Sequence, residues 1–484
     1  MTEQRKRPAP GALRRQPTGT SVGWDSLLPS PNPDGHCGRV SGQVCMSQSS
    51  GSKVRSRVDM VPAACSRRAD CGAWFRTILA CAVLLGAVSP ARAAMVSAAS
   101  CDASAVQQAI DAAADGDTVR VPAGTCTWDR DVSISKTIML VGAGREEGGT
   151  KLLHDGHQHG FLRIDVGAKT GPLDISGFWF FGGISDYYEG LVNWTGPVGW
   201  KRFRFHHNRM EDTQGWAMRG FAGVYGLIDN NEFTGVTAGI VFGGRGETDW
   251  ETAPDLGSSN WFFVEDNEFN FDDWFGSSAG APANDIEDGG RVVFRHNSFT
   301  NAFLQTHDRA RNGWPSANGW EIYNNSFTHT SREQKWKAVD LSAGTGVVWG
   351  NSFHADWIVP IGAMDYKTAL PQSIPRCDGS DPDDQNTPGS NGWRCQYQLG
   401  TGPLHVGNPV YVWSNYELGQ LVGMECTSGC RYPEDTGPFH LQEGRDFINS
   451  GVDPKPQYQP FTYPHPARQG DSLRPKPPTE LKVQ

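Results

Sequence analysis

The chain has 484 residues, of which 38% are hydrophobic, and it carries 43 Lys and Arg against 53 Asp and Glu. From residue 94 onward the balance is 30 basic against 48 acidic residues, a formal charge of −18. This charge disfavours nucleic acid and an anionic membrane surface as partners. It also disfavours an anionic substrate, unless a basic cleft or a bound cation reverses the local field.

A basic leader precedes an apolar run of twelve residues at 77–88. The run is too short to span a bilayer, and three arginines lie before it in residues 67–76. Together with the small-x-small sequence at 91–93, it predicts a secretory signal cleaved before Ala94 and hence an exported protein. Residues 1–59 are too long and polar for a signal, so they are either an overcalled start or a disordered cytoplasmic extension.

Six cysteines remain after the predicted cleavage site, and an even number in an exported chain suggests disulfide bonds. About fifteen pairings of six cysteines are possible. Sequence proximity favours three pairs: Cys101 with Cys126, Cys377 with Cys395, and Cys426 with Cys430. Because no Cys-x-x-Cys pair is present, we do not expect a zinc site.

The stretch 103–128 predicts a short helix followed by a strand. Val106, Ile110 and Ala113 recur on one helical face, and a Gly-Asp turn then leads to a strand around Val119 to Val121. A repeat array needs such a lid on its open end. We therefore expect this helix to cap the first repeat.

Residues 208–351 repeat a short apolar strand followed by Asn and, two residues later, Met or Phe. Successive asparagines are 23 to 36 residues apart, which is the length class of one supersecondary repeat. Each Asn can adopt a left-handed bend and hydrogen-bond to the Asn of the next repeat, with the aromatic ring pointing inward. The six pairs are Asn208 and Met210, Asn231 and Phe233, Asn267 and Phe269, Asn297 and Phe299, Asn325 and Phe327, and Asn351 and Phe353.

These residues resemble the asparagine ladder and phenylalanine stack of the right-handed parallel β-helix in the pectate lyase superfamily. The resemblance implies coils of strand one, a turn, strand two, the Asn corner, strand three and a variable loop, with a catalytic groove along the outer face of strand one. We expect the β-helix to span residues 94–365, a loop-rich disulfide-containing cover 366–450 and a Pro-rich tail 451–484. The tail resembles the C-terminal segment of secreted bacterial β-helix proteins.

Reading back along the sequence from each Asn corner gives a candidate for strand one of that coil. Because side chains of a strand point alternately to its two faces, the sequence assigns each residue to the inner or the outer face. Met218, Ile286, Thr306, Val339 and Leu341 are predicted to point inward. The predicted outward residues are Arg219, Asp285, Glu287, Gln305, His307 and Asp340. Aligned by the strand ends, Glu287, His307 and Asp340 would lie on successive coils about 4.8 Å apart, with Arg219 two coils before Glu287.

The outward residues suggest β-elimination from a uronate polysaccharide, in which a base removes the proton α to the carboxylate while a cation neutralises it. His307 is the predicted base, with Arg309 or Lys337 as alternates, and Arg219 is the predicted neutralising cation. Calcium could replace or supplement Arg219, because carboxylates supply the hard oxygen ligands that it prefers. The candidate ligands are Asp285, Glu287 and Asp288.

Other functions stay open. Glu287 and Asp340 two coils apart would be separated by ~9.6 Å, at the limit for an inverting glycoside hydrolase. The sequence lacks the catalytic motifs NTD, GHG and RIK of polygalacturonases. It also lacks the DPH motif of alginate epimerases and the RxPxxR motif of pectate lyases. A non-catalytic glycan-binding solenoid and a merely solvated polar face are further alternatives.

Long loops beside this face carry Trp250, Trp274 and Trp314, whose indoles could stack on sugars or pin the loops. The sequence thus predicts an exported, monomeric carbohydrate-active protein with a polysaccharide substrate, most simply a lyase.

Overall fold

The computed structural model describes residues 93–156, 160–183, 189–221, 223–271, 281–306, 315–330, 337–364, 397–403, 406–428 and 441–469. The predicted leader and signal sequence lie outside them. None of the helices in these ranges is long and apolar enough to cross a membrane.

The N-terminal cap is a helix packed on the first coil, as the sequence predicts. Helix α1 (Ala103–Ala112) buries Val106 and Ile110, and Gly116 (φ 91°) turns the chain toward the first paired strands. Cys101, just before the helix, forms the predicted disulfide with Cys126. Cys426 is also disulfide-bonded, with its partner outside the described residues, where Cys377, Cys395 and Cys430 lie.

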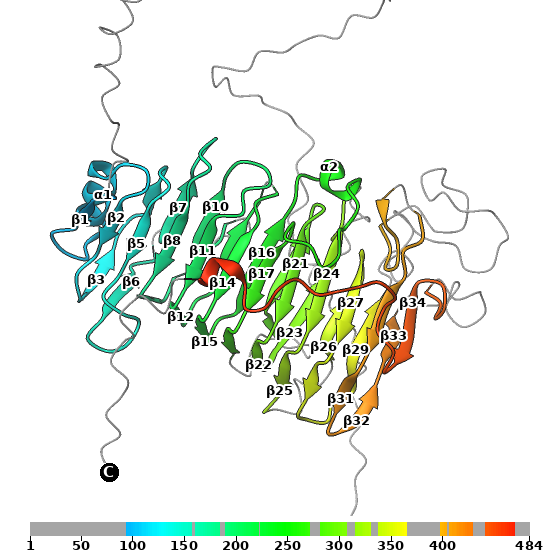
Figure 1. Ribbon diagram of the computed structural model, residues 1–484. Coiled ribbons are helices and arrows are strands. Elements are labelled where there is room, and N and C mark those ends of the chain that lie inside the picture. Colours follow the sequence, from blue (N-terminus) through cyan, green and yellow to red (C-terminus); the bar gives the residue numbers. More distant parts are fainter. Residues whose placement is uncertain are drawn as a thin grey trace, which may run out of the picture. The chain divides into compact units, whose positions relative to one another are not determined.

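The body is a stack of coils, most of which give one strand to each of three walls (Figure 1). The first wall, sheet A, contains β1 (Met95–Ser97), β2 (Thr118–Arg120), β5 (Met139–Val141), β8 (Leu173–Ser176), β11 (Phe203–His206), β14 (Gly226–Asp229), β17 (Phe262–Glu265), β21 (Arg291–Arg295), β24 (Gly319–Tyr323), β27 (Thr345–Trp349), β30 (Val410–Trp413) and β34 (Phe447–Gly451).

The second wall, sheet B, contains β3 (Gly124–Trp128), β6 (Thr150–His154), β9 (Phe178–Phe181), β12 (Arg209–Glu211), β15 (Glu232–Thr234), β18 (Glu268–Asn270), β22 (Ser298–Thr300), β25 (Ser326–Thr328), β28 (Ser352–Phe353), β31 (Asn415–Glu417) and β32 (Gln420–Val422). Only β31 and β32 pair antiparallel among the described strands. Parallel pairing of strands a whole coil apart defines a parallel β-helix.

The third wall has two parts. Sheet C contains β4 (Val132–Ile134), β7 (Leu162–Asp165), β10 (Val192–Thr195), β13 (Trp216–Gly220), β16 (Ala238–Gly243) and β20 (Asn284–Glu287). Sheet D contains β19 (Ala281–Pro282), β23 (Ala302–Thr306), β26 (Lys337–Leu341), β29 (Val359–Met364) and β33 (Met424–Ser428). The Asn284 amide joins them, because its Nδ2 donates to the Gln305 carbonyl (2.7 Å) and its Oδ1 accepts from the Gln305 N–H (3.0 Å).

The predicted asparagine ladder is present and extends beyond the six sequence pairs. From Asn231 onward each ladder Asn accepts, through Oδ1, the backbone N–H of the Asn one coil before it, as in Asn267 to Asn297 (3.0 Å), whereas the Oδ1 of Asn208 accepts from the Phe178 N–H. Asn415 forms a seventh rung that accepts from Asn351. The left-handed residue is not the Asn, as predicted, but the one before it, such as His296 (φ 57°). None of the ladder asparagines has a positive φ.

Phenylalanine rings stack beside the ladder inside the coils. The ring centroids of Phe233, Phe269, Phe299 and Phe327 are 4.7 to 4.9 Å apart, with nearly parallel planes. This spacing equals the distance between strands. The phenylalanine rings therefore repeat along the stack with the same spacing as the strands that carry them.

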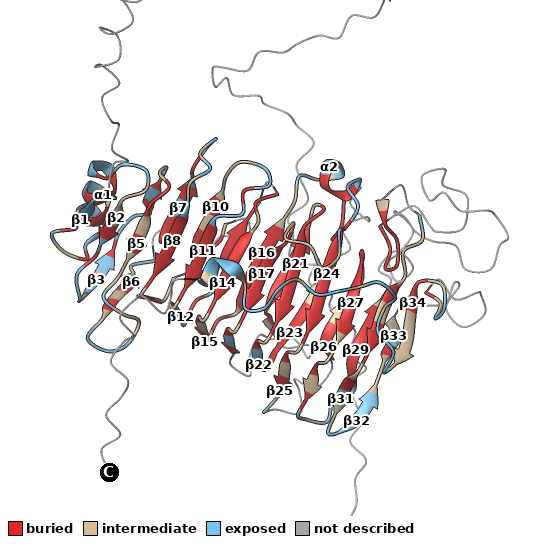
Figure 2. Cartoon of the chain, in the orientation of Figure 1, coloured by how far each residue is buried: buried red, intermediate tan, exposed pale blue. Residues whose placement is uncertain are grey.

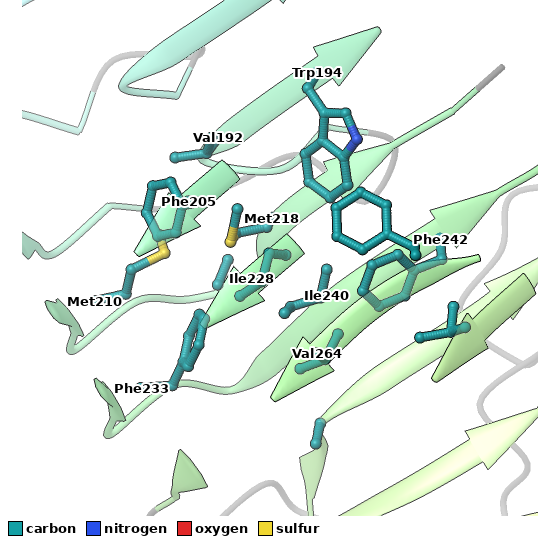
Figure 3. Close-up of a cluster of buried hydrophobic side chains, with 14 of the residues drawn as sticks. Val192, Trp194, Phe205, Met210, Met218, Ile228, Phe233, Ile240, Phe242 and Val264 are labelled. Atoms are coloured by element: carbon teal, nitrogen blue, oxygen red, sulfur yellow. The ribbon is translucent and has the colours of Figure 1, made fainter. Parts of the chain in front are cut away.

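One continuous apolar core fills the space between the walls (Figure 2). In Figure 3, Met210 and Phe233 from sheet B face Phe205 and Ile228 from sheet A. The inward residues predicted on the third wall are confirmed: Met218, Ile286, Val339 and Leu341 are core residues, and Thr306 is buried. The third wall thus has its predicted faces.

The coils continue past the predicted last coil, because β30, β31, β33 and β34 pair in parallel with earlier strands. After β34 the chain turns back, and residues 452–469, here termed the C-terminal strap, run along the outer face of sheet A to the 3₁₀ turn η6 (Pro466–Arg468) (Figure 1). The Pro-rich motifs of the predicted tail therefore have a structural role, because they belong to the segment that covers sheet A.

Candidate active site

Backbone pairing fixes the register of the outer face of sheet C and corrects the alignment by strand ends. Arg219 on β13 lies opposite Val241 on β16, and Val241 lies opposite Asp285 on β20. Glu287 lies opposite Gly243, one step further along. Arg219 is therefore in register with Asp285 rather than with Glu287. The alignment by strand ends was wrong because neighbouring strands do not end at residues that pair with each other.

Arg219 and Glu287 nevertheless meet. The Arg219 Nη2 lies 2.9 Å from the Glu287 Oε1, and the two side chains are only 9% and 8% exposed. The guanidinium also lies 4.6 Å over the Phe221 ring. Gly243 on the strand between them leaves room for that ring, since a Cβ there would lie 2.3 Å from the Phe221 Cδ1.

A second ion pair lies on sheet D. Lys337 Nζ donates to the Asp340 Oδ1 at 2.7 Å, with the lysine side chain 6% exposed. The lysine stem crosses β29 over Gly362, where a Cβ would lie 2.5 Å from its Cδ. Lys337 and Asp340 thus form one fixed unit on β26.

Asp340 lies opposite Gln305 on β23 and not, as the strand ends suggest, opposite His307. The reason is again that β23 and β26 end at different register positions. His307 itself follows the last residue of β23, Thr306, and lies outside the described residues, as does Arg309. The structure therefore brings together Arg219 with Glu287 and Lys337 with Asp340.

The predicted calcium ligands do not converge. Asp285 and Glu287 are two residues apart on β20, whereas Asp288 has φ 54° and its N–H donates to the Pro315 carbonyl, in the turn after the strand. Glu287 already faces the Arg219 guanidinium, which would repel a divalent cation. Among the described residues no group of three His, Cys, Asp or Glu is arranged to hold a metal. The ion pair of Glu287 with Arg219 therefore does not fit a role as a calcium ligand.

Trp250 is not a sugar platform, contrary to the hypothesis for the loops. It is fully buried on α2 (Glu247–Trp250), and its ring centroid lies 4.8 Å from that of Tyr397 in an edge-on contact. It pins its loop to the body. Trp274 and Trp314 lie outside the described residues.

A second set of buried charges, absent from the sequence predictions, lies on the outer face of sheet A. Arg204 pairs with Asp229 through two hydrogen bonds (2.8 and 2.7 Å), and Arg295 pairs with Glu265. The signal was present as charged residues among apolar ones in four neighbouring strands of sheet A, namely β11, β14, β17 and β21.

The C-terminal strap covers this second set. Arg468 pairs with Glu265 at 3.1 Å, and Tyr458 donates to the Glu321 carboxylate at 2.6 Å. Burial lowers the pKa of His465 to about 4 and raises the pKa of Glu321 to about 7. Because the strap lies over them, we interpret these residues as structural.

Comparisons with known proteins give weak similarities. No family model matches the chain, and no curated protein matches it. An alginate lyase from Paenibacillus sp. str. FPU-7 is 12% identical, with 74% of this chain and 99% of that chain covered and a TM-score of 0.39. The catalytic domain of a GH87 alpha-1,3-glucanase with nigerose is 15% identical over 76% and 68% of the chains, with a TM-score of 0.29. TM-scores of this size do not indicate a shared activity, so the function rests on the residues of this chain.

Proposed function

We propose that the chain is an exported polysaccharide lyase that cleaves a uronate-containing polysaccharide by β-elimination along the outer face of sheets C and D. The single observation that carries the proposal is the placement of two nearly buried ion pairs, Arg219 with Glu287 and Lys337 with Asp340, on that face. Charges removed from water cost free energy unless they are paired and hydrogen-bonded, and ionisable groups in such surroundings cluster at functional sites.

The cations on this face suit the charge that β-elimination develops. In this reaction the electrons of the α C–H bond form a double bond, the β C–O bond breaks, and negative charge grows on the uronate carboxylate. Arg219, oriented by Glu287 and Phe221, would neutralise that charge. Lys337, held against Asp340, suits the same role better than that of a base.

His307 remains the proposed base, and in the sequence it directly follows Thr306, the last residue of β23. The proton that it takes would be returned to solvent, and the leaving oxygen would be protonated by water or by a neighbouring acid. A neutral imidazole is the form that accepts the proton, so activity should rise as the pH passes through its titration range.

Glycoside hydrolysis is the second candidate, and the same ion pairs weigh against it. A hydrolase needs one carboxylic acid that holds a proton for the leaving group. Both candidate carboxylates, Glu287 and Asp340, face a cation at 2.9 Å or less, which suits acceptors rather than proton donors. A non-catalytic glycan-binding solenoid would use the face without either reaction.

We also propose a cellular compartment, a hand of the coil and an oligomeric state for this protein. A disulfide between Cys101 and Cys126 supports an oxidising compartment, and hence export after cleavage before Ala94. We propose a right-handed coil, the hand of nearly all parallel crossover connections, and a monomer.

The test is incubation of the protein with alginate, polygalacturonate and a glucuronate polymer, with and without calcium, while ultraviolet absorbance is followed. Absorbance from an unsaturated product supports the lyase, and His307→Ala should abolish it. New reducing ends without absorbance would indicate a hydrolase, and binding without either signal would indicate a glycan-binding protein. An unchanged rate in His307→Ala would overturn the assignment of the base.

A further inference from the structure

A pocket of about 290 Å³ opens on sheet B, a wall that the proposed function does not use. Its lining residues are Ala123, Gly124, Thr125, Glu146, Glu147, Gly148, Gly149, Lys151 and Trp179. Thr125, Lys151 and Trp179 are in register on β3, β6 and β9, so three successive coils supply one side of the pocket.

Lys151 is the chemically distinctive group of this pocket. Its Nζ lies 3.4 Å from the Trp179 ring centroid and 4.6 Å from that of Phe181. Arg209 lies over the same indole at 4.6 Å, but it also pairs with Glu211. Among the described residues Lys151 forms no ion pair, although the chain is rich in carboxylates. Its charge is held in place by aromatic rings and stays available to an anion.

The walls suit a small, hydroxyl-rich ligand. Gly148 leaves open space in this lining, since a Cβ there would meet no atom within 4 Å, whereas Gly124 and Gly149 pack closely against Cys101 and Gly144. Glu147 is exposed at the rim and can accept hydrogen bonds from hydroxyl groups, and Thr125 can donate or accept one. The Cys101–Cys126 disulfide ties β3 to the segment that precedes α1.

Trp179 gives a second, independent observation. The residue is 6% exposed, and its Nε1 is buried with no hydrogen-bond partner in the described part of the chain. A buried N–H without a partner costs free energy, and such groups call for an explanation. A ligand oxygen that reached this N–H after a small shift of the side chains would remove that cost.

We propose that this pocket binds one uronic acid residue, with the carboxylate on Lys151 and the ring hydroxyls on Glu147 and Thr125. A lysine ammonium recognises a carboxylate, and glutamates recognise hydroxyls, so an acidic sugar satisfies both sets of groups whereas a neutral sugar leaves the ammonium without an anion. The pocket would hold an acidic polysaccharide apart from the groove on sheets C and D, and it does not require that the groove be catalytic.

The test is titration of the full chain with D-galacturonic acid, D-glucuronic acid and D-glucose, followed by ligand-observed NMR and calorimetry. A uronic acid should bind at least tenfold more tightly than glucose. Lys151→Gln should weaken that binding at least tenfold, and Lys151→Arg should retain it. Lys201→Gln, an equal change of charge at an exposed lysine, is the matched control.

Equal uronate binding by the wild type and Lys151→Gln, or equal binding of glucose, would overturn the proposal. Circular dichroism and the binding by Lys151→Arg distinguish a lost site from a lost fold. The outcome is separable from the proposed lyase, because Lys151→Gln should keep the rate of product formation on a soluble oligosaccharide within about twofold. His307→Ala should in turn keep the uronate binding of this pocket.

Discussion

Arg219 and Glu287 pair across a strand that belongs to neither of them. Arg219 lies on β13 and Glu287 on β20, and β16 runs between them with Val241 and Gly243 in the intervening positions. The pair can therefore form only because β16 carries small or apolar residues there. It ties together three coils of the third wall.

Substitution of Arg219 by Ala should leave Glu287 as a buried charge without its cation. We expect a loss of about 3–5 kcal/mol in the free energy of unfolding. The joint substitution Arg219→Met with Glu287→Leu should recover most of this stability but none of the activity. Denaturant unfolding measures the first effect and product absorbance the second. A joint variant as unstable as Arg219→Ala would contradict the pairing, and an active one would contradict the proposed role.

Lys337 should matter more for activity than for folding. Lys337→Met keeps the stem that covers Gly362 and removes the charge, so we expect at least a tenfold loss of product formation with a small change in melting temperature. Lys201→Met is the control. A rate unchanged in Lys337→Met would remove this residue from the proposed site.

The ladder can be tested at Asn297, whose Nδ2 donates to the Val264 carbonyl at 2.9 Å while its Oδ1 accepts from the Asn267 N–H at 3.0 Å. Asn297→Ala leaves both partners buried and unsatisfied, and we expect it to cost about 2–5 kcal/mol. Ser298→Ala, one residue further on an exposed position, should change stability by less than about 0.5 kcal/mol. Similar melting temperatures for the two variants would show that the ladder is not needed.

Glu321 predicts a pH dependence of stability. Burial raises its pKa to about 7 in the folded protein, above the value of 4.5 for the free side chain. Its contribution to stability is therefore fully present below about pH 4.5 and is lost as the pH rises through about 7, a change of roughly 3 kcal/mol. Glu321→Gln keeps an acceptor for Tyr458 and should flatten this part of the melting curve against pH. An unaltered slope would contradict the prediction, and Glu251→Gln at an exposed position is the control.

The cap depends on the disulfide between Cys101 and Cys126, which are 25 residues apart. Replacing both by Ser should lower the free energy of unfolding by about 3 kcal/mol, because the open chain gains entropy. Thermal unfolding with and without a reductant measures this. Because Cys426 is also disulfide-bonded, the reductant should still act on the double variant, but it should destabilise the double variant less than the wild type.

The repeat was predictable because its cause is local. An Asn after an apolar strand and an aromatic two residues later are both fixed by the geometry of one corner, and each of the six predicted corners is found. Asn415 was missed because Glu417 stands where the aromatic is expected, 64 residues after the previous rung.

The registers of the outer residues were harder to predict. Strand ends do not align from coil to coil, so Asp340 lies opposite Gln305 and Arg219 opposite Val241. Backbone pairing is fixed by the buried inward side chains of each strand and not by where the strand ends, so an alignment by strand ends can misplace the outward residues by two positions. Contacts such as that between Arg219 and Glu287 join residues 68 apart in sequence and leave no local signal.

The seventh rung also shows how this molecule can change. The interval from Asn351 to Asn415 contains 64 residues, more than any earlier interval between ladder asparagines. The Asn351 N–H nevertheless donates to the Asn415 Oδ1 at 3.1 Å. The distance along the stack is set by hydrogen bonds and not by the amount of chain. A long insertion can therefore lie between two rungs without breaking the ladder, and the loops that border the outer faces can vary while the scaffold stays the same.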